Sequence, residues 1–107
     1  MAEAASSIVR MFENRIAYIN VMCNLSVDCD CCEVAEDPCM RDIGILASLD
    51  PVAIDAACMD RIYAAKDDPG QAHFLERVRR QNGTHILEAA ESLGFGSRAY
   101  EWIDLDP

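Results

Sequence analysis

The residues best suited to chemistry are four cysteines crowded among carboxylates. The segment VDCDCCEVAEDPC, residues 27 to 39, carries Cys29, Cys31, Cys32 and Cys39. Between residues 28 and 42 the chain has six acidic side chains and one basic side chain, which is a formal charge of −5 before any thiol ionises. Because neighbouring anions oppose the ionisation of a thiol, thiolates in this loop require a compensating positive charge.

Three kinds of chemistry could use such a loop. A reactive thiol needs a cationic side chain, a histidine or a helix N-terminus beside it, and neither His73 nor His85 is near the loop in sequence. A dithiol relay normally separates its two cysteines by two residues, whereas Cys31 and Cys32 are adjacent. A metal ion reverses the electrostatics, because thiolates and carboxylates that repel each other both bind a cation. We therefore expect a metal site, with inert thiols as the remaining alternative.

The spacing of the cysteines is usable for metal binding. In an extended segment Cys29 and Cys31 point to the same side and Cys32 points to the other. A kink is therefore needed to place the Cys32 thiol beside the other two. Cys39 can return to the site after the turn at Pro38. Four sulfurs suit an iron–sulfur cluster or a tetrahedral zinc ion, although the spacing matches neither the usual zinc pairs nor a ferredoxin. We expect an iron–sulfur cluster first and zinc as the alternative.

Two cysteines and one further carboxylate lie outside this loop. Cys23 and Cys58 are expected in the core, because a buried free cysteine behaves as a small hydrophobic residue. Asp55 lies at the edge of an apolar stripe on the helix that contains Cys58. It is either a structural hydrogen-bond acceptor or a carboxylate that faces a ligand.

The elements that position this loop follow from periodicity and capping signals. The chain predicts a helix at 2–13, a strand at 15–22, the loop at 23–42, a strand at 42–48, helices beginning at residues 51, 69 and 85, and a strand at 98–105. Asp50 followed by Pro51 is a strong helix start, and Asp68 with Gln71 resembles a capping box. The first strand is apolar on both faces, which suits an inner strand. We expect an α/β or α+β fold, with a small three-stranded mixed sheet packed with about four helices.

Composition and charge narrow the functional classes. The net charge of −10 argues against nucleic-acid binding, which needs clustered lysine and arginine. No run of apolar residues is long enough for a membrane span. The first fifteen residues lack the features of a secretory signal, which predicts a cytoplasmic location. In such a reducing compartment, clustered cysteines are more often metal-binding or catalytic than disulfide-bonded.

Two long stretches, residues 18–63 and 82–103, resemble the C-terminal part of the domain of unknown function 362 family. The most specific motifs are DCDC, DIGILAS.DPVAID and GSR.YE. Members of that family are prokaryotic, frequent in anaerobes, and many carry a ferredoxin-type segment. The resemblance implies that Asp28, Cys29, Asp30, Cys31, Asp42, Ser48, Asp50 and Asp55 belong to the family motifs. It thereby implies a cofactor-binding role for the carboxylates Asp28, Asp30, Asp42, Asp50 and Asp55.

The chain also departs from that family. Members are longer, with an upstream α/β portion and a ferredoxin spacing that this sequence lacks. We therefore expect residues 1–107 to be a single domain or a C-terminal half-domain with uncovered sheet edges, which predicts self-association or a larger protein partner. The first functional hypothesis is a metal-binding, iron–sulfur-associated redox or electron-transfer module. The alternative is a structural or interaction half-domain with passive thiols, and an enzyme of unknown substrate is a third class.

Overall fold

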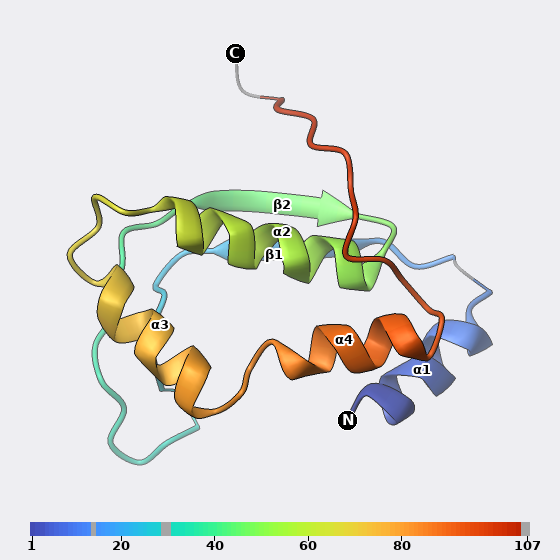
Figure 1. The fold of residues 1–107 in the computed structure, drawn as a ribbon, viewed down its shortest axis with the longest axis horizontal. Coiled ribbons are helices and arrows are strands. Elements are labelled where there is room, and N and C mark those ends of the chain that lie inside the picture. Colours follow the sequence, from blue (N-terminus) through green and yellow to red (C-terminus); the bar gives the residue numbers. More distant parts are fainter. Residues whose placement is uncertain (14, 29–30, 106–107) are drawn as a thin grey trace.

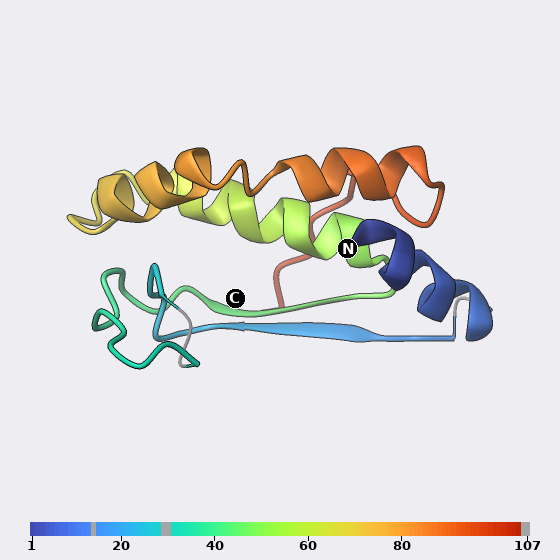
Figure 2. The same ribbon diagram turned by 90° about the horizontal axis from the view of Figure 1, so that it is seen from below.

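The computed structural model describes residues 1–13, 15–28 and 31–105. Over these residues the chain forms four helices and a two-stranded sheet, so the fold is α+β (Figure 1). In chain order the elements are α1 (Ala2–Met11), β1 (Tyr18–Met22), β2 (Gly44–Ser48), α2 (Pro51–Ala64), α3 (Gln71–Arg80) and α4 (His85–Ser92). Figure 2 shows α2, α3 and α4 on one side of the molecule, the two strands on the other, and α1 at one end.

The sheet is a single antiparallel pair. β1 pairs with β2 in a register that runs from Tyr18 opposite Ser48 to Met22 opposite Gly44. The expectation of a three-stranded mixed sheet is therefore wrong, because the described residues form two strands, both antiparallel. The strands themselves begin and end close to their predicted positions at 15–22 and 42–48.

The predicted third strand at 98–105 is an irregular segment instead, which leaves the body of the molecule (Figure 1). Its aromatic residues bind α2: the Tyr100 hydroxyl donates to the Asp60 carboxylate, and the Arg61 guanidinium lies 5.1 Å from the centre of the Trp102 ring. The alternating sequence is compatible with a strand, but the segment pairs with neither edge of the β1–β2 sheet. Here the anchors for the segment lie on a helix.

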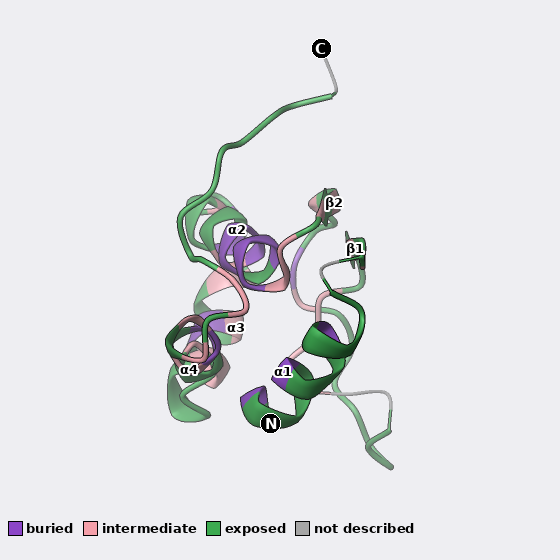
Figure 3. Ribbon diagram, turned by 90° about the vertical axis from the view of Figure 1, so that its right-hand side faces the viewer, coloured by how far each residue is buried: buried purple, intermediate pink, exposed green. Residues whose placement is uncertain are grey.

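Burial divides the two faces of the sheet. On β1, Met22 is buried and Tyr18 and Asn20 are half-buried, whereas Ile19 and Val21 remain 66% and 58% exposed. Because successive side chains of a strand point to opposite faces, only one face of the sheet is covered. The prediction of an inner strand is therefore wrong. Figure 3 shows the same division, with burial concentrated on the helices and both strands largely exposed.

Helix α2 is the centre of the fold, because it contributes to both hydrophobic clusters. The first cluster lies between α2, the strands and α3, and consists of Met22, Met40, Ile54, Cys58, Ile62 and Leu75. The second lies between α2, α1 and α4, and consists of Ala2, Val52, Ala56, Leu87 and Ala90. Both strands, α3 and α4 thus pack directly against α2, whereas α1 packs against α4.

The start of α2 is the one that the sequence predicts. Asp50 Oδ1 accepts hydrogen bonds from the backbone N–H groups of Val52 and Ala53, at 2.9 and 3.0 Å. Pro51 occupies the first helical position, where the missing amide costs no hydrogen bond. The predicted cap and helix start are confirmed.

The start of α3 differs from the predicted capping box. The helix begins at Gln71, and its N-cap residue Gly70 makes no side-chain cap. Gln71 instead donates its side-chain amide to the backbone oxygens of Ile62 and Tyr63, both at 2.9 Å, near the end of α2. Asp68 accepts from the Gly70 N–H at 2.9 Å, and its other oxygen binds outside the helix. Both polar residues therefore connect elements rather than cap one.

Candidate metal-binding loop

The cysteine-rich loop, residues 23–42, is closed near the strands by hydrogen bonds between its two arms. The Cys39 N–H donates to the Leu25 oxygen at 2.8 Å. The Asn24 N–H donates to Asp42 Oδ1 at 3.0 Å. These bonds join the two arms of the loop beyond the end of the β1–β2 pair.

A second set of bonds closes the loop farther out. The Ser26 hydroxyl donates to the Glu36 oxygen at 2.9 Å, and Asp28 Oδ2 accepts from the Glu36 N–H at 3.0 Å. We call the described residues 31–35, which lie beyond these bonds, the loop tip, and the hydrogen-bonded arms the loop base. These bonds join the two arms, so hydrogen bonds within the loop hold part of its base.

Helix α3 holds the loop base through two side chains. Arg77 Nη1 donates to Asp28 Oδ1 at 2.8 Å and to the Val27 oxygen at 2.7 Å, and His73 Nε2 lies 3.1 Å from Glu36 Oε1. The hydrogen bond from Arg77 lowers the pKa of Asp28. The count of charged residues within 28–42 gave one basic side chain. It could not include Arg77, which reaches the loop from α3. A signal was available, since His73 and Arg77 are four residues apart and therefore lie on one helix face.

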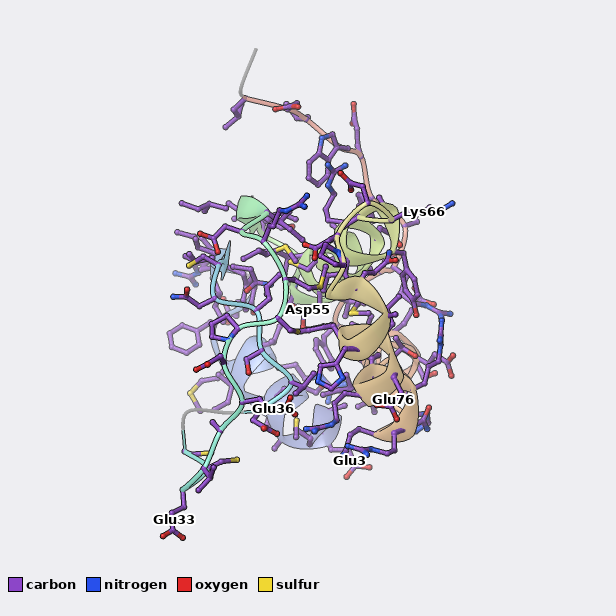
Figure 4. The ribbon with its side chains drawn as sticks, turned by 90° about the vertical axis from the view of Figure 1, so that its left-hand side faces the viewer. Glu3, Glu33, Glu36, Asp55, Lys66 and Glu76 are labelled. Atoms are coloured by element: carbon purple, nitrogen blue, oxygen red, sulfur yellow. The ribbon has the colours of Figure 1, made fainter. Side chains whose placement is uncertain are left out.

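The thiols of the loop tip face solvent. Cys31 and Cys32 are both exposed. Figure 4 shows Glu33 at the far end of the loop, projecting away from the helices and strands. Cys29 and Asp30, which were predicted as a metal ligand and a cofactor-binding residue, lie outside the described residues. The structure therefore places one adjacent pair of thiols at an exposed and protruding position.

Cys39 occupies a different environment at the loop base. Its side chain is partly buried and packs against the cluster that contains Met22 and Met40. Burial raises the pKa of the Cys39 thiol, so this thiol ionises less readily than an exposed one. Among residues 1–13, 15–28 and 31–105, no group of three or more His, Cys, Asp or Glu side chains is arranged to hold a metal ion.

The predicted cofactor-binding carboxylates serve separate parts of the fold. Asp28 binds Arg77 and Asp42 binds a backbone N–H within the loop base. Asp50 caps α2 and also accepts from the Ser97 N–H at 3.0 Å. The structure does not gather the four described carboxylates, Asp28, Asp42, Asp50 and Asp55, around one site, and each of them already accepts a hydrogen bond from the chain itself.

Asp55 and Cys58 share one partner between β1 and α2. Asn20 Nδ2 donates to Asp55 Oδ1 at 2.9 Å and lies 3.3 Å from Cys58 Sγ. Burial raises the pKa of the Cys58 thiol. Cys58 lies in the core, as predicted, whereas Cys23 is exposed, so its predicted burial is wrong.

Comparison with known proteins bears on this loop. A family model described as a domain of unknown function (DUF362) matches residues 1–60 of the 107-residue chain. The chain belongs to the DUF362 family. The DUF362 match includes the whole cysteine-rich loop, both strands and the first ten residues of α2. It begins earlier and ends sooner than the resemblance noted over residues 18–103.

No curated protein and no solved structure matches the chain. The family match therefore establishes membership but names no reaction. Over the described part of this DUF362 chain, no helix has both the length and the apolarity that a membrane crossing demands.

Proposed function

We propose that this DUF362 chain is a metal-binding module, associated with iron–sulfur redox or electron-transfer chemistry, in which cysteines of the loop at 23–42 bind the metal. The observation that carries the proposal is the exposed pair of Cys31 and Cys32 on a tip whose base is held by hydrogen bonds. Packing gives no reason to place two thiols there, because exposed cysteines bury no apolar surface.

The residues present fit a thiolate-bound metal in part. The two exposed thiols suit a soft or borderline cation such as ferrous iron or zinc. Cys39 would join them only if its side chain turned away from the core cluster. When bound, an iron–sulfur cluster would supply one-electron transfer, and zinc would supply a structural link. The acidic surroundings of the loop disfavour the addition of an electron, so a cluster here should have a low reduction potential.

Anaerobic reconstitution tests this proposal. Protein is treated with ferrous iron and sulfide, or with zinc alone, and then desalted and analysed for metal and visible absorption. We expect retained metal in the wild-type chain and in Cys23→Ser, an exposed cysteine outside the tip that serves as the matched control. The double variant Cys31→Ser with Cys32→Ser should lose the metal. Wild-type protein that is folded and retains neither metal would contradict the proposal.

A second candidate function rests on the uncovered face of the sheet. Ile19, Val21 and Ile45 are 66%, 58% and 71% exposed, and in the β1–β2 register Val21 lies opposite Ile45. This supports an interaction half-domain that buries the face against a second copy. A charge-free face allows two chains of net charge −10 to meet without contact between like charges there.

Sedimentation of charged variants tests this second candidate. Ile45→Lys should shift the chain toward monomer, because two copies would then oppose two positive charges in an apolar contact. Met11→Lys is the control, since Met11 is 73% exposed at the end of α1, away from the sheet. A chain that is monomeric before either substitution would dismiss the interaction.

A further inference from the structure

We infer that two copies of this chain exchange a short segment, with Ile103 and Leu105 of each copy packed against the exposed sheet face of the other. The inference rests on the second candidate function, the burial of that face against a second copy, and names the segment that completes the interface. We call residues 103–105 the tail. The exposed sheet face consists of Ile19, Val21, Ile45 and Ala47.

The tail is apolar, and its own chain leaves it uncovered. Just before it, Tyr100 and Trp102 are held on α2. Exposure then rises along the segment, from 37% at Tyr100 and 45% at Trp102 to 72% at Ile103 and 89% at Leu105. Two large apolar side chains this close together form a surface that a partner can cover.

The sheet face by itself is too small to hold two copies together. A five-residue strand is about 16 Å long and two strands side by side are about 10 Å wide, so the face covers on the order of 200 Å². Stable interfaces bury about 800 Å² on each partner. In a reciprocal exchange, each copy adds the area of the tail that it gives and of the tail that it receives.

The position of the tail permits the exchange. Figures 1 and 3 both show the chain after α4 passing α2 and continuing beyond β2, clear of the helices. A second copy stacked on the exposed face would lie about 10 Å from the first sheet, and three extended residues span about 10 Å. The tail can therefore reach the second copy while Trp102 stays on its own α2.

The absence of charge on the two strands favours a second copy as the occupant of the face. Neither YINVM of β1 nor GILAS of β2 contains a charged residue. A basic partner attracted by the net charge of −10 would find no carboxylate on these strands. The face and the tail match each other in chemistry and lie on the same chain. A reciprocal contact between them closes into a dimer.

Sedimentation of charged variants, in the presence of a chelator so that metal plays no part, tests the inference. The double variant Ile103→Asp with Leu105→Asp should sediment as a monomer, because its charges would be buried in an apolar contact. The matched control is Met11→Asp with Val34→Asp, two side chains that are 73% and 88% exposed on α1 and on the loop tip. The control should remain a dimer, as the wild type does.

A mixture of two variants tests the reciprocity of the exchange. Ile45→Lys alone should be monomeric, because it charges the face. Mixed with the tail double variant it should form dimers, since one tail then meets an unchanged face and the other brings aspartates to a lysine. The mass should therefore about double on mixing, although neither component dimerises alone.

Trp102 is the single tryptophan of the chain and reports on the neighbouring tail. Its quenching by acrylamide should fall as the wild-type concentration rises through the range of dimerisation. The same quenching should stay constant in the tail double variant.

The remaining outcomes separate this inference from the second candidate function. A dimer that survives the tail substitutions and dissociates in Ile45→Lys would overturn the exchange and leave the face as an interface. A mixture that stays monomeric would also overturn the exchange alone. A monomeric wild-type chain, or a dimer that Ile45→Lys leaves intact, would overturn both. A far-UV spectrum confirms the fold of each variant, and Ile103→Ser with Leu105→Ser replaces a tail variant that fails to fold.

Discussion

Single carboxylates in this chain connect segments that are distant in sequence, and Asp50 is the clearest case. One of its oxygens accepts from two amides at the start of α2, and the other accepts from the Ser97 N–H after α4. Gly96 lies so close to this carboxylate that a Cβ on it would be 2.4 Å from Asp50 Oδ1. Asp50 therefore fixes both the start of a helix and the course of the chain that leaves the last one.

Replacement of Asp50 tests that role. Asp50→Ala should lower the free energy of unfolding by about 1–2 kcal/mol through the lost cap alone, and further through the lost Ser97 contact. Asp50→Asn keeps one acceptor oxygen and should lose less. Urea denaturation measures both, with Asp67→Ala as the control because the Asp67 side chain is 88% exposed. An Asp50→Ala protein as stable as the control would show that the cap contributes little.

Two adjacent serines of α1, Ser6 and Ser7, differ in burial and in hydrogen bonding. Ser6 is 3% exposed, and its hydroxyl has no hydrogen-bond partner among the described residues. Ser7 is exposed and donates to the Glu3 oxygen at 3.3 Å. A buried hydroxyl without a partner carries a desolvation cost of about 1–3 kcal/mol.

Ser6→Ala should therefore raise the free energy of unfolding, by up to about 1 kcal/mol after the helix propensity of alanine is included. Ser7→Ala should change the stability by no more than a few tenths of a kcal/mol beyond that propensity difference. Thermal and urea denaturation of both variants measure the difference. A marked loss of stability in Ser6→Ala would reveal a partner for this hydroxyl.

Between elements, a close backbone contact joins the start of α3 to the loop base. An ideal Cβ on Gly70 would lie 1.6 Å from the Cys39 oxygen and 2.5 Å from its carbonyl carbon. Asp68 reinforces the same junction by accepting from the Arg41 N–H at 2.8 Å. The backbone at Cys39 is therefore fixed by a neighbouring element as well as by its own loop.

Gly70→Ala should disrupt this junction, because a backbone atom cannot yield as a flexible side chain does. We expect a loss of about 1–3 kcal/mol or more in unfolding free energy, together with faster reaction of the Cys39 thiol with a thiol reagent. Gly83→Ala is the matched control, since its Cβ would meet Val78 Cγ1 at 3.4 Å. Equal thiol reactivity in both variants would argue against the junction as the cause of Cys39 burial.

For the molecule as a whole, three carboxylates link its parts and make its stability depend on pH. The pKa of Asp28 is lowered by the Arg77 hydrogen bond, that of Asp68 by the Arg41 N–H, and that of Glu91 by the Arg98 N–H. A group whose pKa is lower in the folded state stabilises the fold above its unfolded pKa. That contribution is lost as the pH falls through the folded value.

The chain should therefore lose stability below the ordinary carboxyl pKa values of 3.8 for Asp28 and Asp68 and 4.5 for Glu91. Glu91→Gln should be less stable than the wild type at pH 7, and the gap should close as the pH falls through the folded pKa of Glu91. Urea titrations across this acidic range measure the gap. A gap that is independent of pH would mean that the charge of Glu91 contributes nothing.

Local chemistry in the sequence determined much of this protein. The start of α2 at Asp50 and Pro51, the presence of four helices, the two strands beside the loop and membership of the DUF362 family all follow from short segments. These features depend on capping, periodicity and motif residues that are close together along the chain. The cysteine-rich loop was identified as the candidate site for the same reason.

The tertiary structure decided what depends on distant partners. Residues 98–105 have a strand-like pattern, yet Asp60 and Arg61 of α2 bind their aromatic side chains, and no third strand forms among the described residues. Arg77 reaches the loop base from fifty residues away, at Val27. Cys39 is separated from the exposed tip because the core and Gly70 hold its backbone and side chain at the base. Periodicity records which residues are apolar, whereas the identity of the neighbour that covers them is set only when the elements pack.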